Sequence, residues 1–193
     1  MNSLTLMFPV KKDARLAHPI HALMAQRWSP RSFLPGKDLS TAQVQQLFEA
    51  ARWTPSSYNL QPWRYLYAHL GEEGFDRLLS LLHPGNRPRA RHASLLILSL
   101  AETRVEGRDA PNSKAFYDMG AANFALTLQA QDLGLYVHQM GGFDTNKARA
   151  QFDLPEGLEP AVMLAVGYLD QAESEDGVPR KERLRQESFA RPV

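Results

Sequence analysis

Two basic segments of the chain have the residue types and spacing to bind an anion. Arg27, Ser29 and Arg31 flank a Ser-Pro break, and each guanidinium presents a fork of donors that matches phosphate oxygens. Residues 86–92 form a second basic segment with three arginines. Because basic turns are common on protein surfaces, either segment taken alone is better interpreted as a solvated turn.

Two further segments carry polar or small residues that suit a heteroaromatic ligand. Residues 54–63 are bounded by prolines, and the side-chain amides of Asn59 and Gln61 each offer a donor and an acceptor. The adjacent Gly141 and Gly142 precede a helix-capping Asp144, and glycine allows a ligand to approach the backbone closely. Taken separately, each segment is more simply an ordinary turn.

The sequence lacks the motifs of several other enzyme classes. It contains no Gly-x-Gly-x-x-Gly, no Gly-x-x-x-x-Gly-Lys, no Gly-x-Ser-x-Gly and no His-Glu-x-x-His pattern. It also has no cysteine, which excludes disulfides, thiolate metal sites and cysteine nucleophiles. We therefore predict no metal site and no catalytic side chain.

Composition and charge are typical of a globular protein. The chain has 193 residues, 44% hydrophobic and 22% charged, with 22 Lys and Arg against 21 Asp and Glu. The resulting net charge of +1 argues against binding nucleic acid through bulk charge. No apolar run approaches the ~20 residues of a membrane span, and residues 1–12 do not resemble a signal peptide. We expect no nucleic-acid or membrane partner and a cytoplasmic location.

The order of the expected elements indicates an α+β fold. Ser40 and Gln43 form a capping-box pattern at the start of a helix over 40–53. Apolar patterns predict further helices at 18–26, 71–82, 113–133 and 144–152, and strands at 63–68, 95–100, 135–140 and 161–169. Because these elements do not alternate regularly, α+β is favoured over a doubly wound parallel fold. We predict one domain over 1–193, with an N-terminal extension at 1–15 and a C-terminal arm at 171–193.

The expected helix at 113–133 is apolar or small almost all round, with no charge between Asp118 and Asp132. A helix that is apolar on every side must be covered on every side. Either it forms the centre of a monomer core, or a second subunit buries one of its faces. The sequence alone does not separate these alternatives.

Taken together and in this order, the segments resemble the FMN-dependent nitroreductase family. The resemblance covers residues 19–184. It is carried by Arg-x-Ser-x-Arg at 27–31, Pro-Ser-Ser-x-Asn-x-Gln-Pro-Trp at 55–63, Asn86 with Arg89, Asp118 with Gly120, Gly-Gly-Phe-Asp at 141–144, and a basic arm. The resemblance implies a central antiparallel sheet flanked by helices in an intertwined homodimer, with FMN in a cleft between the subunits.

The resemblance also implies which residues bind the cofactor. They are Arg27, Trp28, Ser29, Arg31, Pro55, Ser56, Ser57, Asn59, Gln61, Asn86, Arg89, Gly141, Gly142, Lys181 and Arg183. The first segment would meet the flavin phosphate, ribityl chain or pyrimidine edge, with Trp28 crowding the ribityl chain. The 55–61 segment would approach from the partner subunit, the 86–89 segment would contact the pyrimidine side, and the glycines would lie near flavin N5. The arm would complete the phosphate site, where Arg180 and Arg185 compete with Lys181 and Arg183.

For the reaction, the resemblance implies hydride transfer from NAD(P)H through flavin N5 to a nitroaromatic, quinone or similar small-molecule acceptor, by a ping-pong mechanism. Two alternatives stay open. The first is a flavin-binding or flavin-handling protein on the same scaffold that is not a reductase. The second is a module that binds anions or RNA through the arginines at 87–91 and 180–185, against which the net charge of +1 argues.

Overall fold

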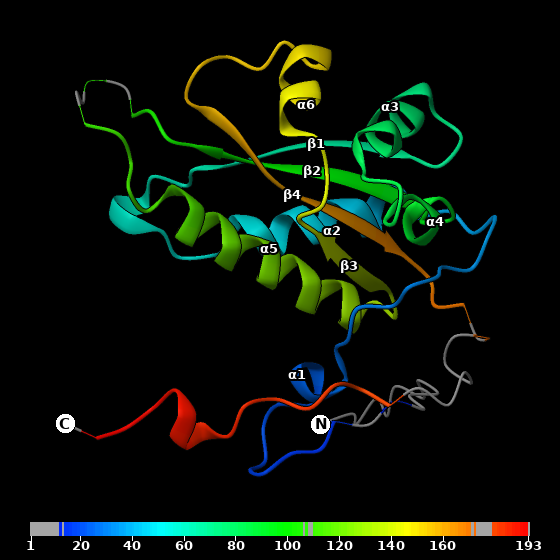
Figure 1. Ribbon diagram of the computed structural model, residues 1–193, viewed down its shortest axis with the longest axis vertical. Helices are drawn as coiled ribbons and strands as arrows, with labels where there is room; N and C mark the ends of the chain where they lie inside the picture. Colours follow the sequence, from blue (N-terminus) through cyan, green and yellow to red (C-terminus); the bar gives the residue numbers. More distant parts are fainter. Residues whose placement is uncertain are drawn as a thin grey trace.

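A four-stranded antiparallel sheet lies at the centre of the computed structural model, which describes residues 12, 14–105, 107, 110–170, 172 and 179–192 (Figure 1). The strands are β1 (Trp63–His69), β2 (Leu95–Glu102), β3 (Tyr136–Met140) and β4 (Leu158–Gly167). Their order is β1-β2-β4-β3, and every neighbouring pair is antiparallel. The predicted α+β class and antiparallel sheet are therefore confirmed.

Helices cover both faces of this sheet. The α-helices are α1 (Ala22–Gln26), α2 (Thr41–Arg52), α3 (Glu73–Leu81), α4 (Arg87–Ala90), α5 (Ala115–Asp132) and α6 (Thr145–Gln151), and the 3-10 turns are η1 (Ser57–Asn59) and η2 (Gln186–Ser188). Helices α2 and α5 lie on one face, and α3, α4 and α6 pack on the other (Figure 1).

The central strand β2 is buried on both of its faces. Leu96 and Leu98 pack into the apolar cluster on the α3 side, whereas Leu95 and Ile97 pack into the cluster on the α5 side. Alternate side chains of a strand point to opposite faces of the sheet, so a continuous apolar run is the pattern that a doubly covered strand requires. The prediction of such a strand at 95–100 is confirmed.

Helix α5 packs on the sheet through a face that carries polar as well as apolar side chains. Asn123 is 1% exposed and accepts a hydrogen bond from the Tyr65 hydroxyl at 3.0 Å. Its amide donates to the Ser99 hydroxyl on β2 at 2.9 Å. Burial raises the pKa of Tyr65, so this hydroxyl stays protonated and remains a donor. The two bonds join α5 to β1 and β2.

A single chain does not cover the opposite face of α5. Phe116 and Phe124 are exposed, and Tyr117 is 80% exposed. The interpretation of this helix as the centre of a monomer core is therefore wrong. An aromatic face left open on an otherwise buried helix is typical of a surface that meets another molecule.

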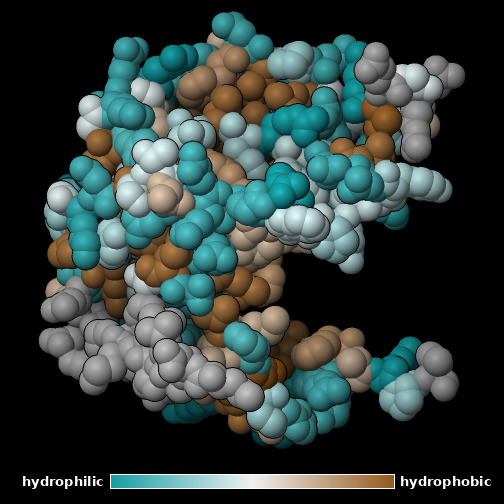
Figure 2. Space-filling view, turned by 180° about the vertical axis from the view of Figure 1, so that it is seen from behind, coloured by the Kyte–Doolittle hydropathy of each residue, from teal (hydrophilic) through white to brown (hydrophobic). Residues whose placement is uncertain are grey.

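The C-terminal arm, described over residues 179–192, projects from the body of the molecule. In the space-filling view a hollow open to solvent separates the projecting end from the body (Figure 2). Leu184 and Phe189 on this segment are exposed. In the part of the chain that the structure describes, no helix has the length and apolar character needed to cross a bilayer.

The predicted capping box is present at the start of α2. The Ser40 hydroxyl accepts from the Gln43 backbone N–H, and the Gln43 side chain accepts from the Ser40 N–H at 2.9 Å. We expect Ser40→Ala to lower the free energy of unfolding by about 1 kcal/mol, because an N-cap side chain contributes about that much. Urea denaturation measures it, with the exposed neighbour Thr41→Ala as control. Equal stability of the two variants would contradict the cap assignment.

Candidate functional site

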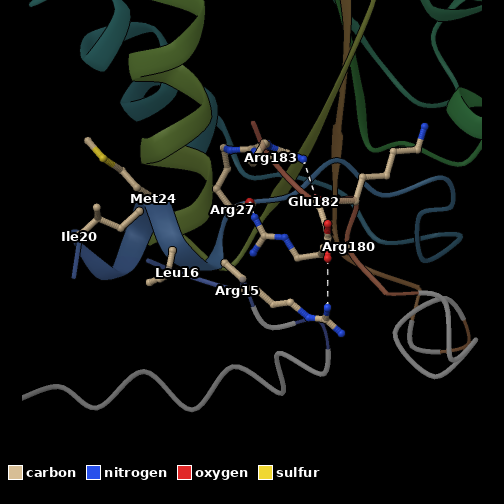
Figure 3. Close-up of a pocket in the computed structure, with 10 residues that line it drawn as sticks. Arg15, Leu16, Ile20, Met24, Arg27, Arg180, Glu182 and Arg183 are labelled. Atoms are coloured by element: carbon tan, nitrogen blue, oxygen red, sulfur yellow. Dashed lines mark hydrogen bonds and ion pairs between the residues drawn. The ribbon is translucent and has the colours of Figure 1, made fainter. Parts of the chain in front are cut away.

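A positively charged pocket lies between α1 and the C-terminal arm (Figure 3). Its volume is about 190 Å³, and its basic lining includes Arg27, Lys181 and Arg183. Arg27 lies more than 150 positions before Lys181 and Arg183 in sequence, yet the fold brings these three predicted site residues to one place. Arg180 holds the arm there, because its guanidinium donates to the backbone oxygens of Ala25 and Arg27.

Positive side chains outnumber negative ones in the described lining of this pocket. Burial, and then the nearby charge of Arg183, lower the pKa of Arg27. The carboxylate of Glu182 forms an ion pair with Arg15 at 3.2 Å. Among the described residues no carboxylate forms an ion pair with Arg27 or Arg183. The half-buried Arg27 and the exposed Lys181 and Arg183 offer a positively charged site to an anion, and forked guanidinium donors match phosphate oxygens.

Trp28 fixes the end of α1 that carries Arg27. Its ring is 9% exposed and meets Tyr136 at the start of β3 edge-on, with 5.8 Å between ring centroids. The Lys12 ammonium lies 4.7 Å from the centroid of the Trp28 ring. Ser29 and Arg31 follow on the exposed surface. The proposed contact of Trp28 with a ribityl chain stays a prediction.

The 55–61 segment, which includes η1, adopts an uncommon backbone conformation. Tyr58, Asn59 and Gln61 have φ of 52°, 55° and 48°, the left-handed region that non-glycine residues rarely enter. Each such residue costs about 1–3 kcal/mol and persists only where the surroundings impose it. Pro55, Tyr58 and Asn59 are exposed.

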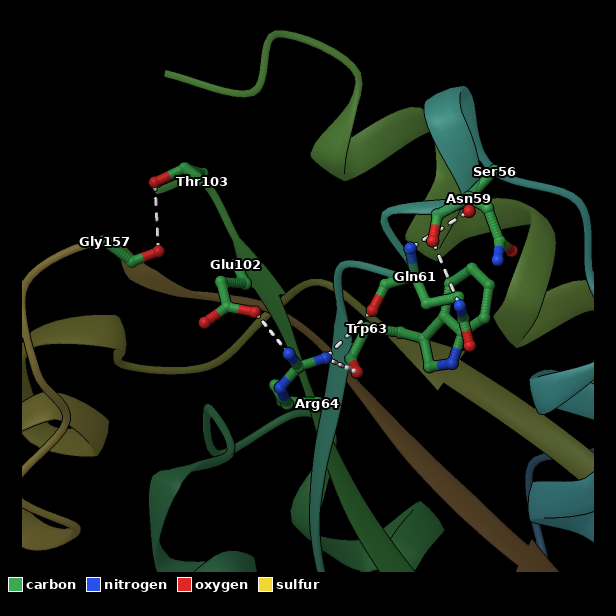
Figure 4. A network of polar contacts seen from close by, with 8 residues as sticks. All are labelled: Ser56, Asn59, Gln61, Trp63, Arg64, Glu102, Thr103 and Gly157. Carbon is green, nitrogen blue, oxygen red and sulfur yellow. Dashed lines mark hydrogen bonds and ion pairs between the residues drawn. The ribbon is translucent and has the colours of Figure 1, made fainter. Parts of the chain in front are cut away.

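Hydrogen bonds within and around the loop impose this conformation (Figure 4). The Ser56 hydroxyl accepts from the Gln61 N–H at 3.0 Å, and the Gln61 side chain donates to the Asn59 oxygen at 3.0 Å. From β1, the Arg64 guanidinium donates to the Gln61 and Trp63 backbone oxygens, each at 2.9 Å, and also pairs with Glu102 on β2.

A buried carboxylate holds the start of the same loop. Asp118 in the first turn of α5 is 3% exposed, and its Oδ2 accepts from the Ser57 N–H at 3.0 Å. The sequence prediction omitted Asp118 and Arg64 from the site. The sequence signal for Asp118 was a single charged residue at the start of an otherwise apolar helix. The residue that it binds, Ser57, lies 61 positions away in the sequence.

The basic segment at 86–92 meets the glycine pair at 141–142. The Asn86 side chain donates to the Gly142 oxygen at 3.0 Å, and the His83 N–H donates to the same oxygen at 3.0 Å. A Cβ at Gly142 would lie 2.7 Å from the Asn86 amide nitrogen, whereas one at Gly141 would meet nothing within 4 Å. A methyl group at Gly142 would therefore displace the end of the Asn86 side chain, whereas Gly141 leaves an open approach to the backbone. Arg89 lies exposed on the neighbouring α4.

The 55–61 loop and the Arg27 pocket lie at opposite ends of α5. The 55–61 loop is tied to Asp118 in the first turn, whereas Trp28 packs on Tyr136, just beyond the last turn. The helix between Asp118 and Asp132 is about 21 Å long at 1.5 Å per residue. One chain therefore does not bring the loop to the Arg27 pocket.

The comparisons with known proteins agree on one family. The model of the nitroreductase family matches residues 24–83 and 69–168. The chain belongs to this family. It is 26% identical over 204 residues to the oxygen-insensitive NAD(P)H nitroreductase of Salmonella typhimurium, covering 83% of this chain and 94% of that one. It is 28% identical over 168 residues to the NADH dehydrogenase of Thermus thermophilus, covering 70% and 78%.

The solved structures include one described as an oxidoreductase containing FMN, with a TM-score of 0.82 and 31% identity over 91% of this chain and 92% of that one. The family resemblance seen in the sequence is thus confirmed. The names of these relatives agree with the predicted enzyme class, an NAD(P)H-dependent oxidoreductase. The individual site residues stay predictions.

We expect Gly142→Ala to destabilise the protein by about 1 kcal/mol, because the new methyl displaces the Asn86 amide and removes its hydrogen bond. Gly141→Ala is the matched control, because its methyl enters open space. Urea denaturation of both variants measures the difference. Equal effects of the two substitutions would show that the contact between Asn86 and Gly142 does not contribute.

Proposed function

We propose that the protein is a homodimeric flavoenzyme that binds FMN and uses NAD(P)H to reduce a nitroaromatic, quinone or similar small acceptor. The observation that carries the proposal is the pocket of Arg27, Lys181 and Arg183, where no carboxylate of the described residues forms an ion pair with these cations. A phosphate monoester carries nearly two negative charges and would relieve the repulsion between these cations. Membership of the nitroreductase family supports the same conclusion.

The residues present suit both ends of FMN, its phosphate and its ring. The Arg27 pocket would hold its phosphate. Asn86, Gly142 and Arg89 lie beyond the other end of β3 and would meet the rim of its ring, with Gly141 open to close approach. Such an elongated ligand would follow β3 from Tyr136 to the glycines. The chemistry that FMN supplies when bound is hydride transfer between a nicotinamide and an acceptor.

The chain's own residues would bind FMN, orient its ring and tune its reduction potential. A cation beside the pyrimidine edge favours negative charge there and raises the reduction potential, and exposed Arg31 and Arg89 are the candidates. Asn59 and Gln61 provide amide donors and acceptors for a ring edge. The family resemblance implies that donor and acceptor use one site in turn, which is a ping-pong order, and the absence of a dinucleotide fingerprint from the sequence agrees with it.

A second copy of the chain would complete the site. The 55–61 loop lies at the far end of α5 from the Arg27 pocket, and the open face of α5 carries Phe116, Tyr117 and Phe124. Pairing two copies through this face would bury the aromatic side chains and bring the loop of one subunit toward the pocket of the other. The projecting arm, with exposed Leu184 and Phe189, would pack against the second subunit (Figure 2).

Visible absorption tests the proposed activity. We expect the protein, purified or reconstituted with FMN, to be yellow and to bleach under anaerobic conditions when NADH or NADPH is added. Recovery of the colour with a quinone would complete the cycle, and initial rates should give parallel double-reciprocal lines. Failure to bleach with either nucleotide would leave a flavin-binding protein that is not a reductase. A protein that is colourless after incubation with FMN and removal of the unbound FMN would contradict the whole proposal.

Two arginine substitutions test the phosphate assignment. We expect Arg27→Ala to weaken FMN binding about 10- to 100-fold, because charged hydrogen bonds contribute about 1.5–3 kcal/mol. Arg87→Ala should change it less than about twofold, since that guanidinium donates to the Leu82 and Ser80 oxygens instead. Fluorescence titration of the apoproteins gives both dissociation constants. Equal weakening in the two variants would show that Arg27 does not bind the phosphate.

A further inference from the structure

The contact between Asp118 and the 55–61 loop joins two elements that are distant in sequence. Ser57 begins η1, where its N–H has no partner inside the short helix. That N–H points to the Asp118 carboxylate at 3.0 Å, and Asp118 is 3% exposed. A buried carboxylate from α5 therefore satisfies the Ser57 N–H, for which the described residues provide no other acceptor.

A buried carboxylate at this position loses hydration, so it adds less to the stability of the fold than its hydrogen bond alone suggests. Charged groups lose hydration on burial and are normally compensated by a cation. Among the residues that the structure describes, no lysine or arginine forms an ion pair with Asp118. Its compensation comes from the Ser57 N–H and from the favourable end of the α5 dipole.

The loop that Asp118 holds is the one with the least favourable backbone in the described chain. Four non-glycine residues have positive φ, and three of them are Tyr58, Asn59 and Gln61. Asp118 fixes the loop before these residues and Arg64 fixes it after them. The two contacts come from α5 and β1, so they anchor the loop at both ends, in addition to the hydrogen bonds of Gln61 with Ser56 and Asn59 inside it.

We infer that Asp118 is a positioning residue, which keeps the 55–61 loop in the shape that presents Asn59 and Gln61 to FMN. The inference rests on the proposed function. Because Asp118 belongs to α5, the same helix that offers the open aromatic face also fixes the binding loop. The carboxylate touches neither cofactor nor substrate and acts through the Ser57 N–H.

Three variants separate this role from general stability. Asp118→Ala removes the acceptor. Asp118→Asn keeps an amide oxygen that can accept the same N–H. Asp132→Asn, on the exposed last turn of α5, is the matched control. FMN titration of each apoprotein gives the dissociation constant, and NMR amide exchange reports the Ser57 N–H together with Leu98 in the core strand β2.

We expect Asp118→Ala to raise the FMN dissociation constant about tenfold and to speed exchange at Ser57, while Leu98 stays protected. The loss of one buried acceptor is worth roughly that factor. Asp118→Asn should restore both values to within about twofold, and Asp132→Asn should match the wild type. A general loss of structure would instead speed exchange at Leu98 as well.

Other outcomes would overturn the inference. They are an Asp118→Ala variant that binds FMN like the control, an Asp118→Asn variant as weak as Asp118→Ala, or a wild-type Ser57 amide that exchanges as fast as an exposed one. This last measurement decides the matter even if Asp118→Ala does not fold. A wild type that binds no FMN would remove the proposed function itself, whereas a wild type that binds FMN with unaffected Asp118 variants would remove only this role.

Discussion

The packing of α5 on the sheet sets the geometry on which the candidate site depends. The helix is held by the hydrogen bonds of Asn123 to Tyr65 and Ser99, so it can neither rotate nor slide without leaving buried polar groups unpaired. Its length then fixes the separation between the 55–61 loop and the Arg27 pocket. A divided site of this kind is incomplete in one chain, and the open aromatic face of the same helix offers the surface through which a second chain would complete it.

Much of the fold could be predicted because its signals are local. The apolar run at 95–100 and the Ser40–Gln43 box each specify an element from a few neighbouring residues. Boundaries that depend on pairing were harder to place. Strand β4 begins at Leu158 and not at 161, because the register shifts at Ser99 and Leu100 and pairing then continues to Glu102. Similarly, α1 begins only at Ala22, where the His21 side chain accepts from the Leu23 N–H.

The site was predictable as a set of segments but not as an arrangement. The sequence indicated cations at 27 and 181–183, and the fold does bring them into one pocket, where Arg180 ties the arm to α1 and Glu182 pairs with Arg15. The left-handed backbone at Tyr58 and Gln61 has no local signature, since neither residue favours it. It arises from hydrogen bonds within the loop, from Arg64 just beyond it and from Asp118, which is 61 positions from Ser57. None of these contacts leaves a periodic trace in the sequence.

The two carbonyl contacts of Arg180 have a consequence for the handling of the protein. They hold the 179–192 segment beside α1, where Arg27 lies. A purification tag fused to the carboxyl end would extend a segment that projects into solvent, whereas clipping by a protease before Arg180 would release Lys181 and Arg183 together with it. Intact mass should therefore be verified in every preparation before its affinity for anions is compared with that of another.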